Sequence, residues 1–511
     1  MFELFRKNKK APLNPQPEDM PKEDRAEGML SESLDKNIAL INKLFEDDDI
    51  MMHRRFGIKK RSGLDFCVFY SDGLVNSMMI NEHIIEPLTK GDFSHTKEIY
   101  EEVKDCVAEV NEIKESADIQ QIISSVTYGD TLLLVEGSSK VLIIGSKGFA
   151  QRSVSEPEGE KILSGPRDGF TEGLMVNLSL IRRRLRTNEL KMRMLTIGKQ
   201  TNTAVCVCYM DNIVNKKILK ELYRRINQIN MDSVLDSNYI TEHIEEKSFL
   251  GFSTTGSTER PDVAVAKLLE GRIAIVVDGS PVVLTAPYLF IENFQSSEDY
   301  YVHRYYATFS RILRMAGFFL SIITPAVYIA VVAYHHEILP AALMMSISSE
   351  RKNVPMGSSV EAFVMLLVFD VLKETGIRMP SHVGQALSIV GALVIGQAAV
   401  EARLVASPMI IVVAFTGITN LLVPKLGAAL LVTRYSILML ASLFGLTGVI
   451  CGVAVIVIHI LNMQSYGVSA TAQGSSLKYQ NVKDTFFRAP WPKMLTRISP
   501  LTSNKTRARL K

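Results

Sequence analysis

Polar side chains interrupt an apolar segment in the C-terminal half of the chain. Residues 383–400 carry no charge, yet they include Gln385, Ser388 and Gln397, and Glu401 follows directly. A helix of this length rises about 27 Å, close to the bilayer's hydrocarbon thickness of about 30 Å. Amide and hydroxyl oxygens at this depth can replace part of an ion's hydration shell, and an acidic group near one mouth favours cations. The residue types therefore raise the question of ion conduction.

Small residues in the same segment leave two interpretations open. Gln385, Ser388 and Ala392 fall on one helical face, whereas Gln397 lies off that face. Glycine and alanine let helix backbones approach closely in lipid, where no hydrophobic force drives helices together. In the first interpretation the amides only bond to neighbouring helices. In the second, their face lines a water-filled path with Val394 as a neighbour.

The elements that must position this segment are other apolar runs, which predict an all-α polytopic transmembrane domain over residues 301–461. Five long candidates are residues 315–334, 356–373, 383–400, 404–423 and 435–461. Arg304, Arg311 and Arg314 precede the first, and the tail 462–511 carries nine Lys or Arg against Asp484. The positive-inside rule then predicts that the N-terminal region and the tail are both cytoplasmic.

Two cytoplasmic ends require an even number of crossings, so one of the five assignments must change. Either the short apolar segment 339–347 also crosses, which gives six, or 356–373 lies in the interface, which gives four. Glu361 and Asp370 lie in 356–373, and each costs roughly 2.5–3.5 kcal/mol on insertion scales. The sequence leaves both counts open.

The soluble half contains an internal repeat. Residues 66–76, FCVFYSDGLVN, match residues 205–215, VCVCYMDNIVN, and residues 136–146 match residues 270–280 at a similar offset. Each copy combines apolar strands with a helical pattern, as in 215–229. We therefore predict an α/β cytoplasmic region of two tandem, similar subdomains.

The predicted organisation has six parts, and the division follows composition. They are a disordered N-terminal tail (1–39), α/β subdomain 1 (40–160), a connecting segment with a basic helix (161–190), α/β subdomain 2 (191–300), the transmembrane domain (301–461) and a basic cytoplasmic tail (462–511). In the connecting segment, Arg182, Arg183, Arg184 and Arg186 indicate either a solvated helix or one that contacts acidic lipid or an acidic protein surface, and we favour the protein contact.

No catalytic or metal-binding pattern emerges. Residues 145–150, GSKGFA, lack the spacing of a phosphate-binding loop, and no helical zinc motif or nucleophile elbow is present. Turn chemistry accounts for Asp72 and Asp211, and strand alternation predicts that Cys206 and Cys208 share one buried face. We therefore expect no enzyme, no cofactor, no metal site and no nucleic-acid partner.

Four longer motifs carry a family resemblance over most of residues 40–500. They are residues 165–172 (GPRDGFTE), 259–287 (beginning ERPDVAVAKLLEG), 380–418 (beginning PSHVGQALSIVGA) and 488–497 (RAPWPKMLTR). These motifs resemble the GerA family of bacterial spore germination proteins, and within it the A subunit. The first 35 residues and the tail after Arg497 do not carry the resemblance.

The resemblance implies a nutrient-germinant receptor in the spore inner membrane, with a permease-like B subunit that holds the nutrient and a lipoprotein C subunit. It also implies that A subunits oligomerise into a channel for monovalent cations, which favours the path-lining interpretation of Gln385, Ser388, Ala392, Gln397 and Glu401. The alternatives are a secondary transporter with Glu361 and Asp370 as coupling groups, and a non-conducting scaffold. A transporter should show inverted repeats in its membrane part, and the only repeat found is in the soluble half.

Overall fold

The fold is described from a computed structural model, in which the chain forms two compact units. The first comprises residues up to 154 with 170–195 and 204–211, and the second comprises the remainder. The described residues are 30–57, 64–91, 99–107, 113–148, 157, 159–378, 391, 394–472, 484–498, 500–504 and 506–507. Residues 1–29 of the predicted N-terminal tail lie outside them. The prediction of disorder is wrong for residues 34–39, which form the first half of helix α2 (Leu34–Leu44) and bury Leu34.

A five-stranded antiparallel sheet organises the first unit. Its spatial order is β1-β2-β4-β5-β3. The strands are β1 (Met51–Gly57), β2 (Asp65–Ser71), β3 (Ile113–Ser116), β4 (Thr131–Val135) and β5 (Val141–Ile144). In the register, Val68 faces Leu133 across β2 and β4, and Leu133 faces Leu142 across β4 and β5. The central strands are buried on both faces, which explains their continuous apolar sequences.

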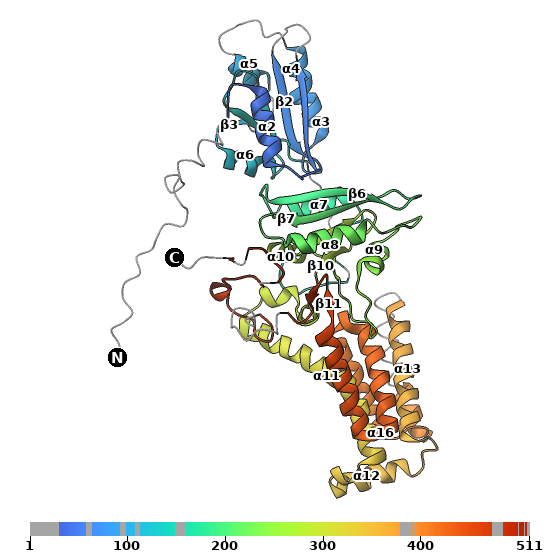
Figure 1. The fold of residues 1–511 in the computed structure, drawn as a ribbon. Helices are drawn as coiled ribbons and strands as arrows, with labels where there is room; N and C mark the ends of the chain where they lie inside the picture. The colour runs from blue at the N-terminus through green and yellow to red at the C-terminus, as the bar shows by residue number, and fades with distance from the viewer. Residues whose placement is uncertain are drawn as a thin grey trace, which may run out of the picture. The chain divides into compact units, whose positions relative to one another are not determined.

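Helices cover both faces of this sheet, because alternate strand residues point to opposite sides. One face packs on α2 (Leu34–Leu44) and α6 (Ile119–Val126), as Figure 1 shows. The other packs on α3 (Ser77–Met79), η2 (Ile80–Ile85), α4 (Glu86–Lys90) and α5 (Ile99–Cys106). Asn76 caps this second group by accepting from the backbone N–H of Met78.

A second sheet repeats the first. Its strands are β6 (Leu190–Ile197), β7 (Thr203–Met210), β8 (Gly256–Thr258), β9 (Ile273–Val277) and β10 (Val283–Ala286). Their order is β6-β7-β9-β10-β8, which is the order of the first sheet with every strand replaced by its counterpart. The helices that accompany it are α7 (Leu174–Arg182), α8 (Lys216–Ile226), α9 (Ser237–Ile244) and α10 (Pro261–Leu269). The predicted repeat of two similar α/β subdomains is thus confirmed at the level of strand order.

Local expectations from the repeat are also confirmed. Asp72 lies in a turn after β2, where its carboxylate accepts from the backbone N–H of Gly73 at 2.9 Å. The Cys206 and Cys208 sulfur atoms lie 3.8 Å apart, and both residues are buried. Neither feature requires a catalytic explanation.

Arg182 departs from the prediction of an exposed basic helix. Its side chain has no exposed surface, and its guanidinium pairs with buried Asp48 and donates to the Leu190 carbonyl at 3.1 Å. A buried cation without a partner would be costly, so this pair is structural. The prediction of a surface for lipid or an acidic partner is wrong for Arg182, whereas Arg186 stacks on the Tyr128 ring.

The second unit contains the apolar helices. They are α11 (Arg304–Tyr334), α12 (Ala341–Arg351), α13 (Ser358–Arg378), α15 (Ser407–Leu421) and α16 (Gly427–Asn462), and residues 394–400 are helical as well. Short helical turns and a small hairpin connect and follow them: η3 (Phe290–Phe294), η4 (Ser297–Tyr300), η5 (His336–Ile338), η6 (Pro424–Leu426), β11 (Gln464–Ser465), β12 (Val468–Ser469) and η7 (Trp491–Lys493).

Two helices of the described residues are long and apolar enough to cross a membrane. They are Arg304–Tyr334 and the continuous stretch Pro424–Asn462, whereas α15 is apolar but shorter. The predicted polytopic all-α domain is therefore not confirmed by helix length and composition.

The long α16 doubles back on itself at Gly445. This residue has φ of 60° and ψ of −140°, a conformation that only glycine adopts readily. Beyond it, a Cβ at Gly452 would lie 3.0 Å from Ile437, on the preceding arm. In one straight helix those residues would be separated by about 22 Å. Residues 427–444 and 446–462 are therefore two antiparallel arms, in the region where the sequence predicted one span at 435–461.

The helices α13 and α15 run side by side in the same direction. Glu361, near the start of α13, binds the backbone N–H of Ala406, which precedes α15. Eight residues further along α13, the Phe369 ring lies against Gly417 of α15. The far end of α15 packs against the N-terminal half of α11, where a Cβ at Gly317 would contact Leu422.

Candidate functional site

The structure describes only part of the predicted conducting segment. Gln385, Ser388 and Ala392 lie outside the described residues, whereas Val394, Gln397 and Glu401 lie within them and are exposed. The Gln397 amide donates to the Glu401 carboxylate at 2.9 Å, one helical turn away. Gln397 thus bonds within its own helix rather than to a neighbouring one, and both side chains remain exposed.

Glu361 is fully buried, and its environment explains its presence in an apolar helix. One carboxylate oxygen accepts from the Ala406 backbone N–H at 2.6 Å, and the other lies 3.5 Å from the Arg351 guanidinium. In a low-dielectric surrounding a carboxylate requires such partners. The side chain therefore joins the start of α13 to the start of α15.

Asp370 is also paired within the helices. It contacts the guanidinium of Arg434, which is 1% exposed, and accepts from the Tyr435 hydroxyl at 2.8 Å. These contacts join α13 to the first arm of α16. Arg434 was missed from the sequence, although a single arginine inside an apolar run was a signal for a buried partner of opposite charge.

A second charged cluster surrounds the start of α11. Arg311 has no exposed side-chain surface, and its guanidinium lies 3.2 Å from Asp299 and 3.0 Å from Asp484. It also donates to the Thr485 carbonyl at 3.2 Å. This cluster, which we call the junction, ties the first turns of α11 both to the segment after the sheet and to the C-terminal tail.

Other side chains complete the junction. Arg314 pairs with Asp299 and donates to the Phe294 carbonyl at 2.6 Å. The Tyr300 hydroxyl donates to Asp484 at 2.6 Å, and burial, followed by the nearby Asp484 carboxylate, raises the pKa of Tyr300 well above its usual range. From the sequence, Arg311 and Arg314 indicate only the membrane topology of the first span. Their second role depends on acids up to 173 residues away.

Beyond the junction, the tail contacts residues of the second unit that follow β7 and α10. Thr502 forms an isolated antiparallel bridge with Val214, and its hydroxyl donates to the Ile213 carbonyl at 2.7 Å. The Arg507 guanidinium pairs with Glu270. The sequence predicts a basic cytoplasmic tail from residue 462 onward. The structure adds that described residues of this tail pack against the α/β part of the same unit.

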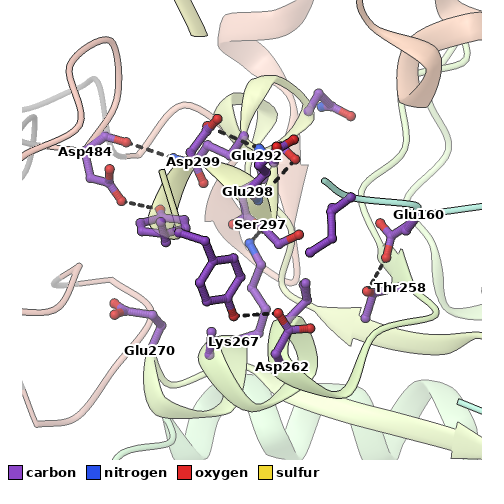
Figure 2. A pocket seen from close by; sticks show the side chains of 18 of the residues that line it. Glu160, Thr258, Asp262, Lys267, Glu270, Glu292, Ser297, Glu298, Asp299 and Asp484 are labelled. Carbon is purple, nitrogen blue, oxygen red and sulfur yellow. Dashed lines mark hydrogen bonds and ion pairs between the residues drawn. The ribbon is translucent and has the colours of Figure 1, made fainter. Parts of the chain in front are cut away.

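A cavity of about 990 Å³ lies beside the junction, between α10, η4 and the tail. Figure 2 shows Lys267 among several acidic side chains that line it, including Glu160, Asp262 and Glu292. Glu292 is the most buried acid, and both Lys267 and Arg272 pair with it. Burial raises the pKa of Glu292, but the two cations oppose it and hold that pKa below its usual value. Within the described residues, no three His, Cys, Asp or Glu side chains gather in a metal-binding group.

Lys267 gives this cavity a pH-dependent stability. Burial lowers the pKa of its ammonium to about 8, whereas the unfolded chain keeps a value of about 10.5. Between these values the unfolded chain binds more protons, so the free energy of unfolding should rise with pH. We expect the melting temperature of the purified chain, minus that of Lys267→Gln, to increase from pH 8 to about 10.5. A difference that stays constant over this range would contradict the assignment.

Comparisons with known proteins agree over most of the chain. The family model described as Bacillus/Clostridium GerA spore germination protein matches residues 39–499. Spore germination protein KA of Bacillus subtilis is 38% identical over 465 residues, which cover 91% of this chain and 86% of that protein. Spore germination protein GerLA of Bacillus cereus is 33% identical, with coverages of 83% and 86%.

Two further relatives are an uncharacterized protein and a solved domain. Uncharacterized membrane protein YfkQ of Bacillus subtilis is 37% identical over 477 residues, with coverages of 93% of this chain and 92% of that protein. The crystal structure of the N-terminal domain of the A subunit of the Bacillus megaterium spore germinant receptor GerK3 is 29% identical, with a TM-score of 0.41. The match covers 51% of this chain and 97% of the crystallised domain.

Proposed function

Because the chain belongs to the GerA family of spore germination proteins, we propose that it acts as the A subunit of a germinant receptor in the spore inner membrane. Several copies assemble, and the segment 383–401 of each copy lines a path for monovalent cations. A permease-like B subunit holds the nutrient, and a lipoprotein C subunit completes the receptor.

The parallel direction of α13 and α15 carries this proposal. Both helices run from the level of Glu361 and Ala406 toward the level of Gly317. The chain that leaves α13 at Arg378 must therefore travel back the full helix length before it reaches Ala406. The intervening residues are those with Gln385 and Ser388, so this return supports a crossing by the segment itself.

The same geometry supports six crossings. The segments are α11, α13, 383–401, α15 and the two arms of α16, because the reversal at Gly445 turns the last predicted span into two. The even number agrees with the bridge between Val214 and Thr502, which requires both residues on one side of the membrane. By the positive-inside rule that side is the cytoplasm.

Pairing of the two membrane acids favours a channel over a secondary transporter. A coupling carboxylate must exchange a proton or an ion with the transported solute. Glu361 and Asp370 instead hold helices together through Ala406 and Arg434. The exposed pair Gln397 and Glu401 remains, on a helix face that a second copy of the chain could complete.

Ion flux across vesicles tests this function. Purified receptor with all three subunits is placed in vesicles loaded with potassium, and nutrient is added outside. We expect nutrient-dependent potassium release, and none when the A subunit is omitted. If potassium release is unchanged without the A subunit, the A subunit does not conduct, and the alternative of a non-conducting scaffold is favoured.

Glu401 should set the preference for cations. Replacing it with Gln removes a negative charge near the mouth, so the ratio of potassium to chloride permeability should fall. The reversal potential across a bilayer holding the receptor measures that ratio. Glu337→Gln, which removes an exposed acid outside the segment, is the matched control. If the ratio of potassium to chloride permeability is the same in both variants and in the wild type, Glu401 does not lie at the mouth of the path.

A further inference from the structure

The helix α11 is longer than a membrane crossing requires. Its 31 residues rise about 46 Å, whereas the hydrocarbon core is about 30 Å thick and the whole bilayer with headgroups about 40–45 Å. If residues 315–334 span the core, the first eleven residues, 304–314, extend through the headgroup layer on the cytoplasmic side. That stretch must suit an environment that is neither oil nor bulk water.

One face of α11 stays apolar and exposed through this stretch. The exposed residues follow helical spacing and include Phe319 and Leu320 within the span, then Ile312, Leu313, Phe309, Tyr306 and Tyr305 toward the N-terminus. The opposite face is buried at Ala307, Arg311 and Phe318. The lipid-facing surface of the span therefore continues without a break into the first turns, and it changes there from aliphatic and phenylalanine side chains to tyrosine.

The C-terminal tail adds aromatic side chains beside the same turns. Phe486, Phe487 and Trp491 are 51%, 65% and 56% exposed. Their position is fixed by neighbours that hold the tail to α11, since the Arg488 backbone N–H donates to the Thr308 hydroxyl at 3.2 Å. Two chain segments thus build one aromatic surface.

Charge accompanies these aromatic groups. The exposed Arg304 guanidinium lies 4.7 Å from the Tyr305 ring centre, and Lys493 is exposed two residues after Trp491. Rings with a polar edge and long cationic side chains are the residues that occupy the headgroup layer, where the cations attract anionic lipids.

We propose that the aromatic surface formed by Tyr305, Tyr306, Phe309, Phe486, Phe487 and Trp491 is seated in the headgroup layer of the cytoplasmic leaflet. The tail then anchors to phospholipid as well as to α11, and the junction is held at a fixed depth. This inference rests on the proposed membrane position of the chain, and it adds a lipid-binding role for the C-terminal tail.

Trp491 is the single tryptophan of the chain, so it reports on this surface without substitution. The full-length chain is placed alone in vesicles that contain anionic phospholipid. The acyl chains carry bromine either close to the headgroup (high bromine) or close to the centre of the bilayer (low bromine). We expect the high bromine to quench Trp491 emission more than the low bromine, and aqueous acrylamide to quench it weakly. As a depth control, Leu320→Trp in a Trp491→Phe chain should be quenched more by the low bromine.

Each alternative gives a different pattern. Strong quenching of Trp491 by acrylamide with none by brominated lipid would place the tail in water and overturn the inference. Protection from both quenchers would mean that a second copy covers the surface, which also overturns it. In either case, quenching of the Leu320→Trp variant by brominated lipid would still support a membrane-spanning α11. If brominated lipid does not quench this variant, the proposed function itself is contradicted.

Discussion

Replacing Arg311 with Met should abolish the nutrient response and lower the yield of folded receptor. The substitution keeps an unbranched apolar stem but removes the guanidinium, so it leaves Asp299 and Asp484 without their shared cation. Removing one partner of a buried ion pair costs on the order of 3 kcal/mol or more. Because Arg314 and Tyr300 still contact these acids, the loss in free energy of unfolding should be about 3 kcal/mol. Thermal unfolding of the purified chain and potassium release measure the two effects.

Two variants separate the junction from charge in general. Arg304→Met removes an exposed arginine from the same helix and should change the melting temperature little. Arg311→Lys keeps the charge but loses the planar fork that reaches both acids, so it should rescue only part of the stability. If Arg311→Met unfolds at the wild-type temperature and responds normally, the junction does not connect the tail to α11 in the way described.

Replacing Ala392 with Phe should remove nutrient-triggered potassium release while the receptor still assembles. Small side chains set the bore of a narrow path, so added volume should matter more than added polarity. Ala392 is expected on the face of Gln385 and Ser388 and lies outside the described residues. The measurement is potassium release from vesicles, with subunit assembly checked by co-purification.

A bulky residue on a lipid-facing surface provides the control. Ile411 of α15 is 70% exposed, and Ile411→Phe adds volume where lipid can yield. We expect normal release from this variant. Normal release from Ala392→Phe, and from bulky substitutions along the rest of 383–401, would make the segment a packing helix and place the path elsewhere.

The α/β region could be predicted because its signals are local or repeated. The match between residues 66–76 and 205–215 reflects strands β2 and β7, which occupy the same place in sheets of the same order. Burial on both faces gives such strands continuous apolar sequences, which any reader of the sequence can recognise. The turn at Asp72 and the buried pair of Cys206 and Cys208 follow from the same regularity.

The remaining features depend on partners distant in the chain. The local sequence around Arg182 is typical of a surface helix, because its partner Asp48 lies 134 positions away in the chain and only the fold brings the two together. The reversal at Gly445 lies in an apolar run in which other glycines, such as Gly448 and Gly452, are helical, so composition alone does not mark the break. Likewise, a basic tail signals topology, and only the fold reveals that Asp484 and Thr502 fix it to the unit.

Cysteine accessibility along 383–401 tests most directly whether this chain lines the cation path. Ala392→Cys is made in a Cys451→Ser receptor, because Cys451 is the exposed native thiol among the described cysteines. A charged, water-soluble thiol reagent should then stop nutrient-triggered potassium release, and the same reagent should leave release from Ile411→Cys unchanged. Complete modification of the cysteine at 392, and at 385 and 388 in turn, with no change in release would contradict the account.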